Sequence, residues 1–329
     1  MSTLFGLHLD LIDLFLGETE KKKYCAMVKT QGTRYGIGEW YGTRFTELSP
    51  AQRLRYASLS GVSTEDCPHQ PGPNLCNKRG GVCSMAVYVN LGDGTASIDP
   101  SNPGLVALCP YRFWQNHTIF KEVGSEILGT KKPVLIKEVG FLRSIDHRGR
   151  VGKEIVGRID MVVARADKQT DSIVDWCALE MQAVYFSGKS MNHEFKAIRE
   201  NPNVIPFPKE MRRPDFRSSG PKRLMPQLQI KVPTLRRWGK KMTVVVDQPF
   251  YRSIAPMKRV ASLSNADIAW FVVDYDKKTS VLNVSEIVYT TLESSVEGLT
   301  AGQPVDRQEF ERELEKYYTT ESTKLIRLS

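Results

Sequence analysis

Apolar residues recur along the chain with two periods, and the shorter period, in which side chains alternate between two faces, predicts strands. Three predicted strands follow one another closely at residues 134–142, 155–165 and 173–185. The polar segments between them, DHRGR and DKQTD, are short, so we expect an antiparallel meander. Four further strands are predicted at residues 85–89, 242–247, 268–276 and 281–292.

The longer period, about 3.6 residues, predicts helices. Apolar residues fall at this spacing within residues 4–16, and helices are also predicted at about 113–128, 188–200 and 306–318. Residues 201–241 are predicted to have irregular backbone, because prolines there would break longer elements. These prolines are Pro202, Pro206, Pro208, Pro214, Pro221, Pro226 and Pro233. The strands and helices together predict an α/β fold with an α+β type of mixed sheet.

The composition fits a folded protein of the cytoplasm. Hydrophobic residues make up 41% of the 329 residues, which is enough for a substantial core. The apolar run at residues 4–16 is interrupted by Asp10 and Asp13 and lacks the flanks of a signal peptide, so neither secretion nor membrane insertion is expected. No G-x-x-x-x-G-K-[ST] motif is present, so we expect no nucleotide cofactor.

The positive charge of the chain is concentrated in one stretch. Lys and Arg total 46 against 37 acids, a formal charge of +9. Residues 209–241, the basic window, hold eleven basic residues and two acids, so they carry the whole excess. A patch of this kind is typical of a surface that meets phosphates, although a solvated charge run is the usual alternative. The candidate DNA contacts within it are Arg212, Arg213, Arg217, Lys222, Arg223, Arg236 and Arg237.

Two acids interrupt apolar rows on neighbouring predicted strands. Glu180 and Gln182 share a strand face with Trp176 and Ala178, and Asp160 is the lone acid on its face of the preceding strand. Burying a carboxylate in such a row is costly unless a cation or hydrogen bonds compensate. If the strands pair as a hairpin, Asp160 and Glu180 lie side by side and can chelate one Mg²⁺. The alternative is that these residues face water on a half-exposed sheet.

Four of the six cysteines lie in a stretch rich in Pro and Gly. Cys67, Cys76, Cys83 and Cys109 are separated by intervals of 9, 7 and 26 residues, which are not the paired C-x-x-C spacing of a common zinc ribbon. In a chain without a secretion signal, such a cluster favours metal binding over disulfides, with four unrelated buried thiols as the alternative. Thiolates accept iron or zinc, and a complete tetrahedral shell would make the site structural.

Five segments resemble the NotI-like type II restriction endonucleases, in order and at compatible spacing over residues 67–192. They read CPHQPGPN-LC, KRGGVCS, ALCPYR, GRIDMVV and LEMQAVYFSGKSM. The last two also resemble the PD-(D/E)XK nuclease superfamily in its E-x-Q form. The resemblance implies that Asp160 and Glu180 bind Mg²⁺ and that Gln182 stands where most of the superfamily has Lys. Neutral Gln can only orient the attacking water. Glu138 is a candidate further carboxylate, in competition with Glu122, Glu126 and Glu154.

The same resemblance implies a homodimeric enzyme of a restriction-modification system that cuts a short, GC-rich palindrome in double-stranded DNA, with iron rather than zinc at the four cysteines. We therefore divide the chain into an N-terminal region with the four-cysteine metal site, residues 1–112, and a PD-(D/E)XK catalytic and DNA-binding domain, residues 113–329. A repair or structure-selective nuclease of the superfamily is one alternative. A non-catalytic metal-binding DNA-binding protein is the other.

Overall fold

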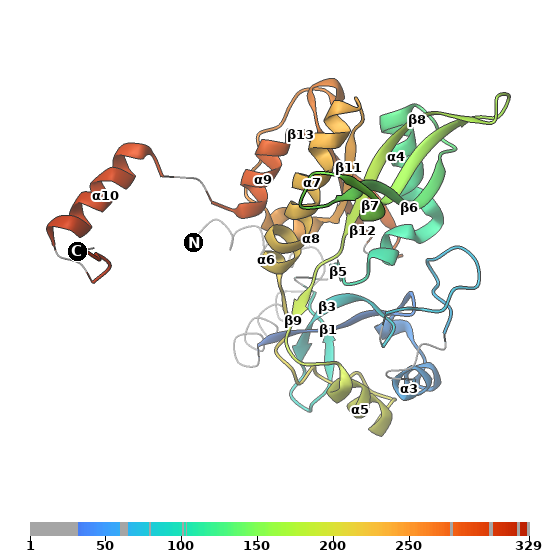
Figure 1. Cartoon of the computed structure of the whole chain (residues 1–329). Coiled ribbons are helices and arrows are strands. Elements are labelled where there is room, and N and C mark those ends of the chain that lie inside the picture. Colours follow the sequence, from blue (N-terminus) through green and yellow to red (C-terminus); the bar gives the residue numbers. More distant parts are fainter. Residues whose placement is uncertain are drawn as a thin grey trace.

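The computed structural model contains two sheets, one central and one small, with helices around both (Figure 1). It describes residues 32–59, 65–78, 80–100, 102, 104–276, 279–302, 305–320 and 323–327. The helix predicted at residues 4–16 lies outside the described residues, as does Cys25.

The central sheet has six strands in the order β13-β12-β11-β8-β7-β6. Their bounds are β6 Val134–Ile145, β7 Val151–Asp167, β8 Ser172–Gln182, β11 Met242–Asp247, β12 Ile268–Tyr275 and β13 Leu282–Thr290. β11 runs parallel to β8 and β12, whereas β6, β7 and β8 form an antiparallel meander, so the sheet is mixed. The predicted strands and meander are confirmed. β6 and β7 are longer than predicted, because they continue beyond the part of the sheet that packs on helices.

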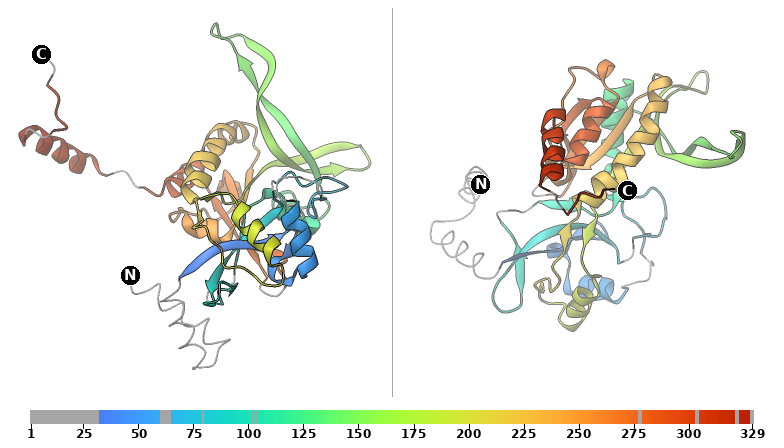
Figure 2. Two further views of the ribbon diagram at one scale, coloured as in Figure 1. Left: turned by 90° about the horizontal axis from the view of Figure 1, so that it is seen from below. Right: turned by 60° about the vertical axis from the view of Figure 1, so that its left-hand side comes forward.

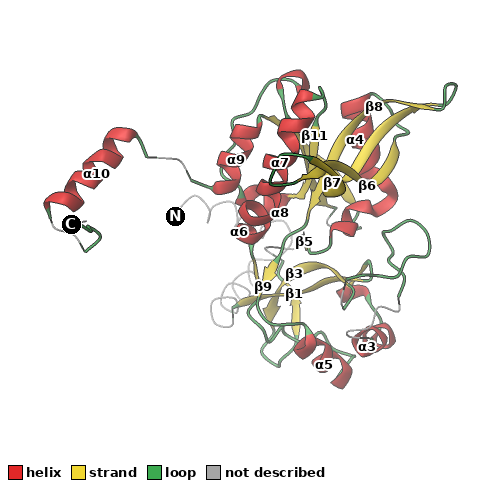
Figure 3. Ribbon diagram, viewed as in Figure 1, coloured by secondary structure: helices red, strands yellow, loops and turns green. Residues whose placement is uncertain are grey.

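Helices cover both faces of this sheet and make an α/β/α sandwich (Figure 3). On one face α4 (Thr118–Leu128) buries Ile119 and Phe120 against Val163 of β7. On the other face lie α7 (Met225–Arg237), α8 (Gln248–Ser253) and α9 (Leu292–Thr300), where Leu228 packs with Val244 of β11. The fold class predicted from the sequence, mixed α/β, is confirmed.

The small sheet is antiparallel and is built from the N-terminal third. It contains β1 (Thr33–Trp40), β2 (Thr43–Arg44), β3 (Val82–Asn90), β4 (Ala96–Ile98) and β5 (Leu105–Ala107). Beside it lie η1 (Phe45–Glu47), α3 (Pro50–Ser58) and α5 (Asn192–Glu200), and Trp40 stacks on Phe195 of α5 with ring centroids 5.2 Å apart. The chain therefore returns to the small sheet after β8, through the two-stranded pair of β9 (Phe186–Ser187) and β10 (Arg213–Pro214).

Two predictions about helices are wrong in detail. Residues 216–237 are helical rather than irregular: α6 (Phe216–Ser219) continues through a π-helical segment, η3 (Gly220–Leu224), into α7. Pro226 lies at the junction of η3 and α7, where the backbone changes from π-helical to α-helical turns. The helix predicted at residues 113–128 is instead split into η2 (Pro110–His117) and α4, because Asn116 and His117 adopt left-handed backbone.

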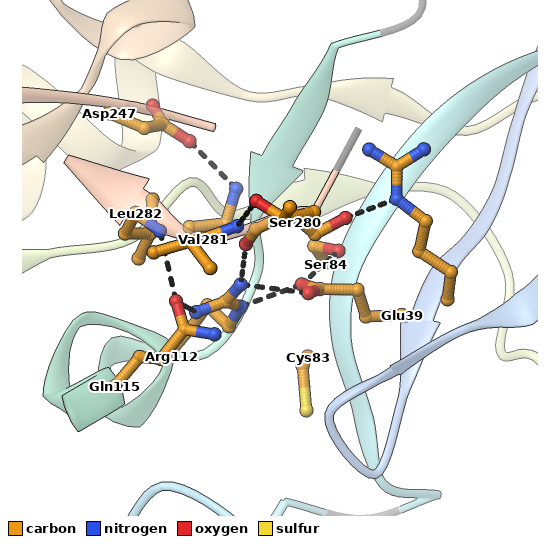
Figure 4. A network of polar contacts seen from close by, with 12 residues as sticks. Glu39, Cys83, Ser84, Arg112, Gln115, Asp247, Ser280, Val281 and Leu282 are labelled. Atoms are coloured by element: carbon orange, nitrogen blue, oxygen red, sulfur yellow. Dashed lines mark hydrogen bonds and ion pairs between the residues drawn. The ribbon is translucent and has the colours of Figure 1, made fainter. Parts of the chain in front are cut away.

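A buried ion pair ties the small sheet to the central sheet (Figure 4). Arg112 of η2 donates two hydrogen bonds of 2.8 and 2.9 Å to Glu39 of β1, and both side chains are almost fully excluded from water. The same guanidinium donates to the Ser280 carbonyl at the start of the β13 hairpin, and Ser84 donates to Glu39. Such a pair is tolerated in a dry interior only when its remaining donors and acceptors are also satisfied, as they are here.

The C-terminal helix α10 (Arg307–Thr319) confirms the helix predicted at residues 306–318. It has no buried residue and lies apart from both sheets (Figure 1). None of the helices in the described part of the chain combines the length and apolarity needed to cross a bilayer. The remaining short element is η4 (Leu263–Asn265).

Candidate active site and cysteine site

Asp160 and Glu180 lie side by side on β7 and β8. Met161 pairs with Leu179 at the end of the antiparallel register, and Asp160 and Glu180 are the next residues beyond that pair on the two strands. Glu180 is buried, with 7% of its surface exposed, because β11 pairs with its other side through Val244. The side chain of Asp160 is 62% exposed. The site therefore has one acid inside the protein and one at its surface.

A lysine that the sequence reasoning missed completes this pair. The Nζ atom of Lys231 lies 2.7 Å from Oε2 of Glu180 and 3.5 Å from Oδ1 of Asp160, and only 1% of the residue is exposed. Lys231 sits on α7 in the same buried stripe as Leu228 and Leu235. A lysine at a core position of an amphipathic helix is the signal that could have revealed it. The prolines of the basic window concealed the helix and therefore the stripe.

Burial and charge set the protonation of Glu180. Burial raises its pKa to about 7, the Lys231 ammonium opposes that rise, and the Asp160 carboxylate adds to it. With both acids ionised, the three groups carry a net charge of −1. A divalent cation at this place would compete with the proton on Glu180 and would make the site positive toward a phosphodiester.

The two other predicted catalytic residues are placed differently from each other. Gln182, two residues beyond Glu180 on the same strand face, is partly buried, and its Nε2 donates to the Ala183 carbonyl at 2.6 Å. Within the described residues, its Oε1 atom receives no hydrogen bond and can act as an acceptor. Glu138 lies across from Asp160 in the β6–β7 register, but its side chain is 73% exposed and forms a 3.4 Å ion pair with Arg158. The described structure therefore does not bring Glu138 into contact with Asp160, Glu180 or Lys231.

The basic window divides into internal and exposed cations. Arg212 is buried, and four of its five N–H donors form hydrogen bonds to Glu194 and to the Lys189 and Ser190 carbonyls. The burial of Arg212 and these four hydrogen bonds speak against the predicted DNA contact, because only one Nη1 N–H is left for a phosphate or a base.

Two further members of the predicted set bind other side chains at the protein surface. Arg236 forms ion pairs with Asp267 and Glu293, and Arg237 donates to the Thr234 hydroxyl at 3.1 Å. Arg213, Arg217 and Lys222 are exposed, and Arg223 is exposed with its guanidinium 4.6 Å from the Tyr185 ring centroid. These four cations lie close to the carboxyl end of β8, because the Tyr185 carbonyl accepts a hydrogen bond from the Asp215 amide.

The four predicted cysteines share one neighbourhood in the small sheet and its loops. All four are buried, and backbone hydrogen bonds hold Cys67 to Asn74 and Cys109 to Cys83. Burial raises the pKa of Cys76, Cys83 and Cys109, and other thiols of the set raise them further. Cys177 is buried in β8.

Four thiols form a donor set that suits iron or zinc. Close by, the Nε2 atom of the buried His69 has no hydrogen-bond partner. Within the described residues, however, no three His, Cys, Asp or Glu side chains gather closely enough to enclose a metal ion. The thiols are thus near one another without forming a closed coordination shell.

Comparison with known families adds an independent finding. The family model described as "Restriction endonuclease NotI" matches residues 55–285, which is more than half of the chain. The match spans the four cysteines, the pair of Asp160 and Glu180, and Lys231. No curated protein matches the chain. From the extent of the family match, the chain belongs to the NotI family of restriction endonucleases.

Proposed function

We propose that this protein is a Mg²⁺-dependent type II restriction endonuclease that hydrolyses phosphodiester bonds of double-stranded DNA at the edge where β7 and β8 meet. The observation that carries the proposal is the Asp160–Glu180 pair with the buried Lys231 ammonium against it. An exposed and a buried carboxylate on paired strands, flanked by a helix cation, is an arrangement suited to a PD-(D/E)XK type of active site.

The donor set of the site fits a magnesium ion. Mg²⁺ prefers hard oxygen ligands and is usually held by one or two carboxylates, with water and substrate phosphate in its other positions. Asp160 and Glu180 supply those two carboxylates, and the exposure of Asp160 leaves access for substrate. When bound, Mg²⁺ stabilises the charge on the scissile phosphate and acidifies the attacking water.

The side chains at the site have separate roles in the proposed reaction. Glu180 and Asp160 would hold the cation, and the Oε1 atom of Gln182 accepts a hydrogen bond from the attacking water and orients it for in-line attack. Lys231 supplies, from a helix, the positive charge that the superfamily lysine supplies from the strand. Its ammonium holds Glu180 in position and faces the charge that develops on the phosphate.

The four cysteines are proposed to hold one structural iron or zinc. Such a metal would bring Cys67, Cys76, Cys83 and Cys109 into a closed tetrahedral shell, and it would order loops that are poor in apolar residues. The resemblance to the family favours iron.

The substrate is proposed to be a short, GC-rich palindrome bound by a homodimer. A two-fold symmetric protein matches a palindrome, since each protomer meets one half-site. Arginine forks suit the O6 and N7 atoms of guanine, and Arg213, Arg217 and Arg223 are exposed beside the end of β8. A repair or structure-selective nuclease is the alternative within the same chemistry, and a non-catalytic DNA-binding protein is the alternative outside it.

Plasmid digestion tests the proposal. Wild-type protein with Mg²⁺ should give discrete fragments whose mapped ends share one palindrome, and Glu180→Gln should abolish cleavage while DNA binding in Ca²⁺ survives. Glu138→Gln is the control, because Glu138 is exposed and outside the cluster. Cleavage by the Glu180 variant at a tenth of the wild-type rate or faster would refute the site. Ends without a common sequence would favour the repair alternative.

A further inference from the structure

A two-stranded extension of the central sheet contributes no residue to the hydrophobic core. β8 pairs with β7 only from Met161 onward, so the preceding part of β7 pairs with β6 alone. Residues 143–158, the ribbon, include no buried residue, and Figure 2 shows this hairpin projecting beyond the body. An isolated two-stranded hairpin is marginally stable in water. A ribbon of this length that buries nothing therefore points to an external partner.

The side chains of the ribbon identify the chemistry of that partner. The ribbon has five basic residues, Arg143, Arg148, Arg150, Lys153 and Arg158, against two acids, Asp146 and Glu154. Asp146 is paired with Arg150, and Arg158 is paired with Glu138. Arg143, Arg148 and Lys153 have no acidic side chain of the described residues within ion-pair distance. The unpaired charge of the ribbon thus fits a polyanion.

The ribbon begins at the proposed active site. Arg158 is two residues from Asp160 on the same strand face. With a rise of about 3.3 Å per residue, Lys153 lies at most about 23 Å along the strand from Asp160, and the start of β7 at most about 30 Å. That reach equals roughly seven to nine base pairs of B-DNA at about 3.4 Å each. A duplex whose scissile phosphate lies at Asp160 would pass within reach of the ribbon.

We propose that the ribbon enters the major groove of the DNA duplex next to the scissile phosphate. This inference rests on the proposed function. The major groove of B-DNA accepts a two-stranded β-ribbon, whose side chains then meet base edges and flanking phosphates. The exposed Ile145, Val151 and Val156 also suit this place, because apolar side chains contact thymine methyl groups there. The ribbon adds exposed cations to those of the basic window, several of which are buried or form ion pairs within the protein.

A charge-matched pair of triple variants tests the ribbon. Arg143, Arg148 and Lys153 are replaced together by Gln. In the control, Lys121, Lys131 and Lys132 are replaced by Gln, since these lysines ring a pocket of about 400 Å³ on the α4 side of the sheet, away from Lys231. Binding of a fluorescein-labelled duplex of mixed sequence is measured in Ca²⁺ at several salt concentrations. The salt slope is the magnitude of the slope of log K for DNA binding against the logarithm of the salt concentration. It should be smaller by about 2–3 in the ribbon variant than in wild type, whereas the control should match wild type.

A second probe tests whether the ribbon contacts the major groove. The same duplex is made with glucosylated 5-hydroxymethylcytosine, which fills the major groove. Wild type should lose about tenfold or more in affinity for it, and the ribbon variant should lose less, since its groove contacts are already gone. Equal losses in both proteins, or no loss in wild type, would overturn the placement in the major groove.

The outcomes separate this inference from the proposed function. If wild type fails to bind the duplex at all, the proposed function fails. If wild type binds and cleaves but the ribbon variant keeps the wild-type salt slope, only the ribbon assignment fails. If the ribbon instead docks on a second copy of the chain, the ribbon variant should keep the wild-type salt slope but differ from wild type in its sedimentation coefficient. That result would also overturn the ribbon assignment.

Discussion

The proposed chemistry depends on a few single residues, and only some of them can be predicted from the sequence. Asp160 and Glu180 could be predicted to be neighbours, because each is the lone acid in an apolar row and the two strands are joined by a short turn. Lys231 could not, since it is 51 residues from Glu180 along the chain and meets it only through the packing of α7. Contacts between adjacent strands are local in sequence, whereas those between helix and sheet depend on the tertiary fold.

Replacement of Lys231 by Met separates charge from metal binding. We expect cleavage to fall at least about a hundredfold, because the neighbouring carboxylates lose their only contacting ammonium in the described residues. Mn²⁺ binding measured by titration calorimetry at pH 8 should stay equal or tighten, since a positive charge has been removed from beside the cation. Lys222→Met, on the exposed part of the basic window, is the control. Cleavage within threefold of wild type would contradict the role of Lys231.

Asp247 gives the protein a pH-dependent stability of predictable sign. Complete burial raises its pKa to about 7, although the Ala107 and Phe250 amides donate to it. The folded state therefore holds a proton that the unfolded state releases near pH 4. Stability from this group is present below that pH and is lost as pH rises to 7, by up to about 4 kcal/mol.

Urea unfolding between pH 4.5 and 7.5 measures this effect. Glu180 acts in the same direction, so the comparison is made in a Glu180→Gln background with and without Asp247→Asn. The Asn variant should be less stable at low pH, because its amide NH₂ cannot accept the second backbone N–H, but its stability should depend less on pH. Parallel pH profiles for the two proteins would exclude Asp247 as the source.

At the scale of elements, strands were predicted closely and proline-rich helices were not. β11 and β12 are continuous apolar runs, a pattern that survives any tertiary context. α7 was missed because prolines were read as breakers, whereas the buried stripe of Leu228, Val232 and Leu235 is strong enough to hold a helix that contains Pro233. The burial of these three core side chains outweighs the low helix propensity of proline.

Pro233 is therefore expected to cost stability. It lies inside α7 on the exposed side, where its ring removes one backbone hydrogen bond. Pro233→Ala should stabilise the protein by about 1–2 kcal/mol, after the greater entropy of the unfolded chain is subtracted. Pro226→Ala is the comparison with a smaller expected change, because Pro226 lies at the junction of η3 and α7, where the α-helical hydrogen-bond pattern is already interrupted. Urea unfolding checks both, and a destabilised Pro233 variant would show that the proline sets the path of α7.

At the scale of the whole molecule, the structure depends on how the cysteine-bearing small sheet is held to the catalytic sheet. The sequence placed the cysteines before the catalytic strands, but it could not show that residues 186–214 return to the small sheet, since β9 and β10 are two residues each. Nor could it pair Glu39 with Arg112 across 73 residues. These links arise only when the two sheets pack.

The Glu39–Arg112 pair should therefore carry a large, non-additive share of the stability. Glu39→Leu leaves the Arg112 guanidinium buried without its counter-ion, and we expect a loss of about 3–5 kcal/mol by urea unfolding. Glu39→Leu combined with Arg112→Met removes both charges and should cost clearly less than the sum of the single variants. Glu286→Gln, which breaks an exposed pair with Arg259, should cost less than about 1 kcal/mol. Additive losses at Glu39 and Arg112 would mean that the two sheets are held together mainly by apolar packing, and that the buried pair only adapts to it.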